Sequence, residues 1–114
     1  MAAYRLTVRH GPKVERESFE TLDGAVEALE RHAEEVRGEG PLQEISALRD
    51  VQAGDRVHAR LELSAGSLLR GREAGLDVMG DGALVPYTGV IRKRRLEPGR
   101  NQSAFDAVRE ALTG

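Results

Sequence analysis

The residues best suited to chemistry form a basic run near the C-terminal end of the chain. They are Arg92, Lys93, Arg94 and Arg95, followed shortly by Arg100. Such cations contact nucleic-acid phosphates and supply affinity without reading the base sequence. The run falls in an expected strand, where alternate side chains point to opposite faces, so only two of the four consecutive residues share a surface. Because charges also protect exposed sheet edges, the run predicts either a nucleic-acid contact or a solvated edge strand.

A second group of charged residues lies on the outward side of two expected strands. Its members are Arg5, Arg9, His58, Arg60 and Glu62. Together they could receive an acidic ligand, although cross-strand ion pairs, with Asp77 as a further acid, are the ordinary state of such a face. The face also lacks the aromatic side chains on which a sheet-based RNA reader stacks bases. The pattern favours a solvated, salt-bridged face, with ligand binding or catalysis as the alternative.

The three histidines, His10, His32 and His58, are the imidazole ligands that the sequence offers to a metal ion. No His-x-x-x-His pair occurs, and the chain has no cysteine for a thiolate site. His32 is expected at the border of an apolar helix stripe, and His58 is expected to be exposed on a strand. Neither a metal ion nor another cofactor is therefore predicted.

Catalytic motifs are absent from the sequence. The glycine pair Gly80 and Gly82 precedes an expected strand, whereas a phosphate-binding loop requires a helix at that point. No serine lies in a nucleophile elbow, and the acids around residues 30–35 form a solvated helix face. An enzyme is therefore not the favoured interpretation.

Length and composition indicate one domain spanning residues 1–114. The apolar fraction of 39% is too high for a disordered chain, and the charged fraction of 32% indicates a well-solvated surface. No apolar run reaches the length of a signal sequence or a membrane span, so a cytoplasmic location is expected. Arginine outnumbers lysine by 15 to 2, a bias typical of a GC-rich bacterial genome.

The net charge of −2 is unevenly distributed along the chain. Residues 1–55 hold 7 basic and 12 acidic side chains, whereas residues 56–114 hold 10 basic and 7 acidic ones. An acidic half and a basic half indicate complementarity within one subunit or between subunits, or else a basic binding face.

The first half of the chain predicts a hairpin followed by a helix. Alternation of polar and apolar residues predicts a strand over 4–10, and a weaker pattern predicts its return over 14–19. Thr21 is expected to cap a helix whose apolar residues recur from 22 to 36. Residues 42–55 fit either a short helix or a distorted strand.

The second half predicts a three-stranded meander and a final helix. Alternation marks strands over 57–63 and 72–79, and a last strand region over 84–96. Ser103 and Asp106 are spaced as a capping box at the start of the final helix.

These elements predict an α+β fold of order β-β-α-β-β-β-α. We expect an antiparallel sheet of about four to five strands, with two amphipathic helices packed on one face. From residue 21 onward the element order is similar to that of the double-stranded-RNA-binding domain. That family has basic residues at the start of its last helix, whereas the sequence from Ser103 to Asp106 brings an acid there.

The favoured function is a small non-catalytic binding or protein-interaction module that self-associates, as a homodimer for example, or binds another protein. The expected sheet edges and the complementary charge halves support this interpretation. The first alternative is a nucleic-acid-binding domain that uses the basic last strand. The second is a small-ligand carrier or an enzyme with a site on the charged sheet face.

Overall fold

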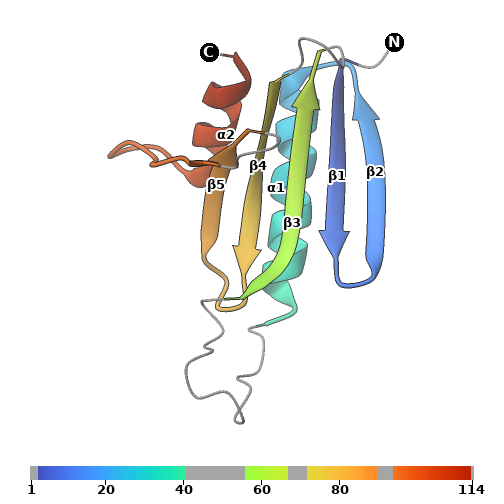
Figure 1. Cartoon of the computed structure of the whole chain (residues 1–114), viewed down its shortest axis with the longest axis vertical. Coiled ribbons are helices and arrows are strands. Elements are labelled where there is room, and N and C mark those ends of the chain that lie inside the picture. Colours follow the sequence, from blue (N-terminus) through green and yellow to red (C-terminus); the bar gives the residue numbers. More distant parts are fainter. Residues whose placement is uncertain (1–2, 41–55, 67–71, 90–93, 114) are drawn as a thin grey trace.

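The structure is a computed structural model that describes residues 3–40, 56–66, 72–89 and 94–113 of the chain. It contains β1 (Tyr4–His10), β2 (Lys13–Phe19), α1 (Leu22–Gly38), β3 (Val57–Ala65), β4 (Arg72–Met79), β5 (Leu84–Thr88), β6 (Arg94–Arg95) and α2 (Ala104–Thr113) (Figure 1). An antiparallel sheet with two helices confirms the predicted α+β class and element order, with six strands in place of four to five. The ambiguous segment 42–55 lies outside the described residues.

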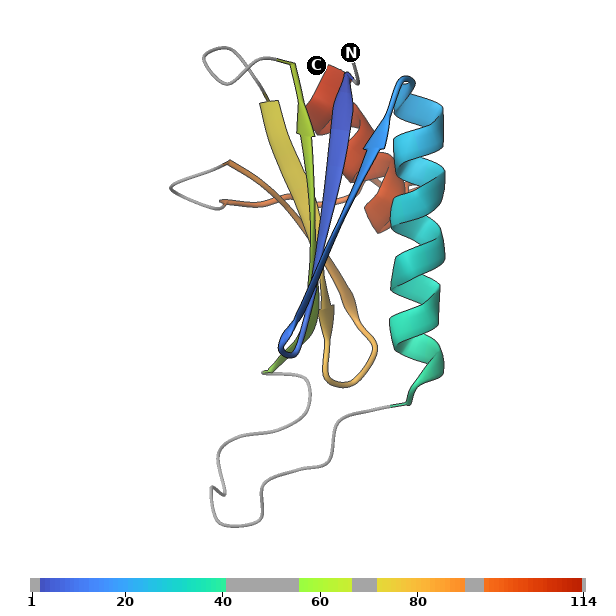
Figure 2. The ribbon, with the colours of Figure 1, turned by 90° about the vertical axis from the view of Figure 1, so that its right-hand side faces the viewer.

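The strands form one sheet in the order β2-β1-β3-β4-β5-β6, and all neighbouring strands are antiparallel. The hairpin of β1 and β2 therefore occupies one end of the sheet, with β2 at its edge. Both helices cover the same face, as Figure 2 shows. We call the opposite, uncovered side of the sheet the open face.

A core of aliphatic side chains joins the covered face to the helices. Leu6 and Val8 of β1 lie on this side, and the alternation of buried and less buried positions continues along β3. The largest fully buried side chains are Leu6, Leu29, Leu61, Leu63, Leu76, Val78 and Val108. Because these come from both helices and three strands, burial of apolar surface holds the two layers together.

Both predicted helix caps are present. The hydroxyl of Thr21 accepts a hydrogen bond from the backbone N–H of Gly24 at 3.1 Å. At α2, the backbone N–H of Ser103 donates to the Asp106 carboxylate, and the Asp106 N–H donates to the Ser103 hydroxyl. This reciprocal pair satisfies two backbone donors that the first turn of a helix leaves without partners.

The predicted last strand over 84–96 is divided in the structure. β5 ends at Thr88, Gly89 takes a φ of 104°, and the chain returns as the short strand β6. β6 pairs with β5 through Tyr87↔Arg95 and Thr88↔Arg94. A left-handed backbone at Gly89 ends the strand because β conformation requires a negative φ. Among the described residues, no helix is both long and apolar enough to span a membrane.

The close approach of Tyr87 to Gly75 generates a prediction about stability. A methyl group at Gly75 would lie within 3.0 Å of the Leu61 carbonyl oxygen and the Tyr87 hydroxyl. We expect Gly75→Ala to lower the free energy of unfolding by about 1–3 kcal/mol because the crowded backbone cannot yield. Urea unfolding followed by circular dichroism measures this change.

Gly38→Ala is the matched control, since a methyl group at Gly38 would meet no atom within 4 Å. It should leave stability unchanged or raise it by up to about 1 kcal/mol. Equal stabilities of the two variants would contradict the packing of Tyr87 over Gly75.

Candidate metal centre

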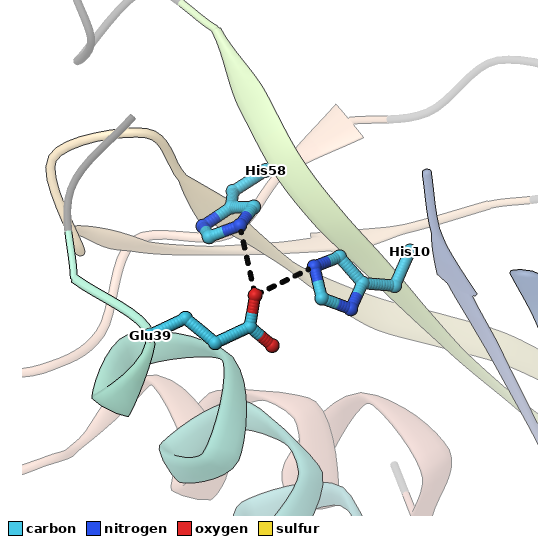
Figure 3. Close-up of side chains that lie close together, drawn as sticks. All are labelled: His10, Glu39 and His58. Carbon is cyan, nitrogen blue, oxygen red and sulfur yellow. Dashed lines mark ion pairs between the residues drawn. The ribbon is translucent and has the colours of Figure 1, made fainter. Parts of the chain in front are cut away.

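Three ionisable side chains from three elements meet where α1 ends, as Figure 3 shows. His10 is the last residue of β1, Glu39 follows α1 directly, and His58 is the second residue of β3. The Nε2 atom of His10 lies 3.2 Å from Oε1 of Glu39, and Nε2 of His58 lies 3.5 Å from the same oxygen. One ligand atom from each residue lies within 4.8 Å of the others. We call this group the His–Glu–His cluster.

The positions of His10 and Glu39 follow from regular structure. Leu6 and Val8 point to the covered face, so strand alternation directs His10 to the same side, at the end of β1. Glu39 is the C-cap residue of α1, and its backbone N–H donates to the Val36 carbonyl at 3.1 Å. This bond fixes the backbone from which the Glu39 side chain reaches toward the sheet.

The position of His58 depends on an irregularity in β3. Val57 pairs with Met79 and Ala59 pairs with Val78, so His58 is an extra residue between two consecutive pairs. Such a bulge changes the direction of a side chain. Regular alternation would direct His58 to the open face beside Arg60, but the structure brings it to Glu39 instead.

The cluster is partly shielded from solvent. The exposed fractions of the side chains are 11% for His58, 29% for His10 and 48% for Glu39. The two imidazole rings have centroids 5.0 Å apart and meet edge to face at 68°. Both Nε2 atoms approach one carboxylate oxygen. These contacts are attractive if each Nε2 carries a hydrogen and donates it to the oxygen, or if the two nitrogen lone pairs and the oxygen bind one cation together.

The spacing suits a tetrahedral transition-metal ion. Ligand atoms about 2.0–2.1 Å from Zn²⁺ lie about 3.4 Å apart along a tetrahedral edge, close to the observed 3.2 and 3.5 Å. The ligand nitrogens of His10 and His58 lie within 4.8 Å of each other, so both imidazoles are within reach of one ion. Two nitrogens and one oxygen are ligands that Zn²⁺ accepts, and three protein ligands leave one coordination position for another group.

A pocket of about 110 Å³ lies beside the cluster, between the end of the β1–β2 hairpin and the second half of α1. It shares His10 and Glu39 with the cluster. His32 also lines it and is 91% buried, its exposed fraction being 9%. Its two nitrogens lie 3.6 and 3.8 Å from carboxylate oxygens of Glu17 and Glu35, so this histidine faces a different pair of acids.

The charged group predicted on the outward side of the strands is found there except for His58. Arg60 makes two hydrogen bonds with Asp77, at 2.7 and 3.0 Å, and Arg9 lies 3.6 Å from Glu62. The expected cross-strand ion pairs are therefore present. Arg5 is exposed on the same side, at the other end of β1 from His10.

The basic run lies at the other end of the sheet. Arg94 and Arg95 are exposed in β6, and Arg100 is exposed in the turn before α2. Arg92 and Lys93 lie outside the described residues. The structure thus separates this group from the charged residues of β1 by the width of three strands.

The His–Glu–His cluster was not expected from the sequence. A signal for His10 was available, because the alternation of β1 puts it on the side of Leu6 and Val8. Glu39 follows a helix and has no motif around it, and the bulge that redirects His58 has no recognisable signature in the sequence. Comparisons of the chain with protein-family models, with curated proteins and with solved structures find no match. The function is therefore inferred from the residues of this chain alone.

The buried phenol on the open face generates a prediction about pH. Tyr87 is 3% exposed, and its burial, with smaller effects of Glu62 and Asp77, raises the pKa of its phenol well above the ordinary 10.0. The folded state thus keeps a proton that the unfolded chain releases near pH 10. We expect the contribution of this group to the free energy of unfolding to be fully present below pH 10 and to be lost as the pH rises above 10.

Alkaline titration of the near-ultraviolet phenolate absorbance, on folded and urea-unfolded protein, measures this difference. Tyr87→Phe keeps the ring and removes the titrating group, so its stability should fall less steeply above pH 10. Identical phenolate titrations of the folded and unfolded wild-type protein would contradict the expected shift.

Proposed function

We propose that this chain is a small non-catalytic binding module that holds a divalent transition-metal ion, Zn²⁺ above others, between His10, Glu39 and His58. The observation that supports the proposal is the approach of two imidazole nitrogens to one carboxylate oxygen, at 3.2 and 3.5 Å. These residues are distant in the sequence, so only the folded chain contains the complete ligand set.

The arrangement of the three side chains is compatible with an ion. Without an ion, each imidazole needs a proton on the nitrogen that faces the carboxylate oxygen, which the neutral Nε2–H tautomer supplies. A divalent ion would replace both facing protons and bind both nitrogen lone pairs together with the carboxylate oxygen, so the two rings, whose centroids are 5.0 Å apart, would share one cation.

The surroundings of the cluster support binding more than catalysis. Among the described residues, no serine or lysine makes a hydrogen bond with the three ligands, so neither of these residue types adds a nucleophile or a proton donor to the two imidazoles and the carboxylate. Metal chemistry without such a group is limited to what the ion and its open coordination position supply.

Self-association, predicted from the sheet edges and the charge halves, remains a prediction. The edge strand β2 is well exposed and carries two bases and two acids between Lys13 and Glu17. Charges along an edge strand discourage direct pairing of two sheets. The geometry therefore supports binding of a metal ion more strongly than self-association.

Zinc should stabilise the chelator-treated protein against heat. An ion that binds only the folded state adds about 2.7 kcal/mol when its free concentration is a hundred times the dissociation constant. We expect His10→Gln and His58→Gln each to weaken binding at least tenfold, because each removes one of three ligands. Isothermal titration calorimetry with ZnCl₂ measures the affinity, and thermal unfolding with and without zinc measures the stabilisation.

His32→Gln is the matched control, since His32 lines the adjacent pocket and contacts other acids. This variant should keep wild-type affinity for zinc. Mg²⁺ should not stabilise the protein, because this ion prefers oxygen ligands in octahedral geometry. The proposal is wrong if wild-type protein does not bind zinc, or if the three histidine variants bind it equally well.

A further inference from the structure

We propose that the open face binds the phosphate backbone of a nucleic-acid duplex without reading its base sequence. The residues that carry this inference lie on β1, β2 and β6, away from the His–Glu–His cluster. It therefore does not depend on metal binding. It concerns the surface that the helices leave uncovered, as Figure 2 shows.

Three exposed arginines gather at the β1–β2 end of the open face. Arg5 and Arg9 alternate with the buried residues of β1, so they point away from the helices. Arg16 of β2 stands directly across from Thr7, between these two positions, and therefore points to the same side. We call Arg5, Arg9 and Arg16 the arginine surface.

The charges of the arginine surface are incompletely compensated. Arg60, at the centre of the sheet, is held by two hydrogen bonds to Asp77, whereas Arg9 has a longer contact of 3.6 Å with Glu62. For Arg5 and Arg16, the described part of the chain shows no carboxylate partner. Guanidinium groups without a close carboxylate are available to bind an anionic partner.

Hydroxyl groups lie among these arginines. Ser18 of β2 and Ser64 of β3 stand across from Arg5 on either side, and Thr7 follows it on the same face. Hydroxyl and guanidinium groups are the usual donors to phosphate oxygens. Arg5 and Arg9 are four residues apart on a strand, about 13 Å, so they reach different phosphates.

The chemistry of this surface favours a duplex over a single strand. Single strands are bound through aromatic side chains on which their bases stack. On the described parts of β1, β2 and β3, the side chains that point to the open face include no aromatic residue. Tyr87 of β5 lies on the same face, but it is 3% exposed and offers no ring surface to a base. Contacts limited to the phosphate backbone suit a duplex, whose bases are already stacked.

A further arginine stands across the open face. Arg95 of β6 pairs with Tyr87, whose side chain lies on the open face, so Arg95 is in register with that face and its neighbour Arg94 is not. β6 lies four strand spacings from β1, or about 19 Å, and Figure 2 shows that it projects on the side of the sheet opposite α1. A duplex has phosphates on two strands, so it can contact Arg95 and the arginine surface together.

The binding of labelled random-sequence duplex DNA and duplex RNA to the full chain, followed by fluorescence anisotropy, tests the proposal. Affinity should fall steeply between about 50 and 200 mM salt, because each phosphate contact releases counterions. The double variant Arg5→Gln/Arg16→Gln should bind at least tenfold more weakly at low salt. It should also lower the log–log salt slope by about two, one for each lost contact.

The matched control is Arg31→Gln/Arg37→Gln, which removes the same charge from exposed positions on α1. This variant should bind duplexes nearly as the wild-type chain does, and circular dichroism should show that both variants are folded. The proposal fails if no duplex binds at about 50 mM salt, or if both double variants lose affinity equally.

A second copy of the chain is the competing occupant, since its acidic α1 could also face the arginine surface. Light scattering over a range of protein concentrations distinguishes the two. A mass that rises with concentration, and no longer rises in Arg5→Gln/Arg16→Gln, would assign the face to self-association and overturn the nucleic-acid proposal. A constant mass together with salt-sensitive duplex binding supports it.

Discussion

Packing of α1 and α2 against one face of the sheet requires each strand to divide its side chains between a dry side and a wet side. On β1, this division sends Leu6 and Val8 inward and Arg5 and Arg9 outward. The same division separates the two candidate sites. The His–Glu–His cluster lies at the border of the covered side, and the arginines occupy the open face.

A regular sheet could not have formed the His–Glu–His cluster. The alternation that buries Ala59 and Leu61 would send His58 to the open face, where its neighbours are Arg60 and Glu62. One extra residue in β3 changes the direction of His58, and the pairs from Ala59 to Ala65 stay in register. The candidate metal centre therefore depends on a local departure from the pattern that builds the core.

The sequence predicted those parts of the fold that local patterns determine. Alternation located β1 and β3, and hydroxyl residues located the starts of both helices at Thr21 and Ser103. The division of the last strand was not predicted, because the pairing of Arg94 and Arg95 with β5 is a contact that alternation along one strand does not reveal. The cluster was missed because tertiary contacts bring Glu39 to His10. The spacing of these residues in the sequence does not indicate such contacts.

The convergence of His10, Glu39 and His58 also concerns the order in which the molecule assembles. Intervals of 29 and 19 residues separate these positions, and each belongs to a different unit: the hairpin, the helix end and the meander. No two of these units contain all three side chains. The complete group therefore forms only when all three units have docked, so its appearance during refolding would report that the hairpin, the helix end and the meander are assembled together.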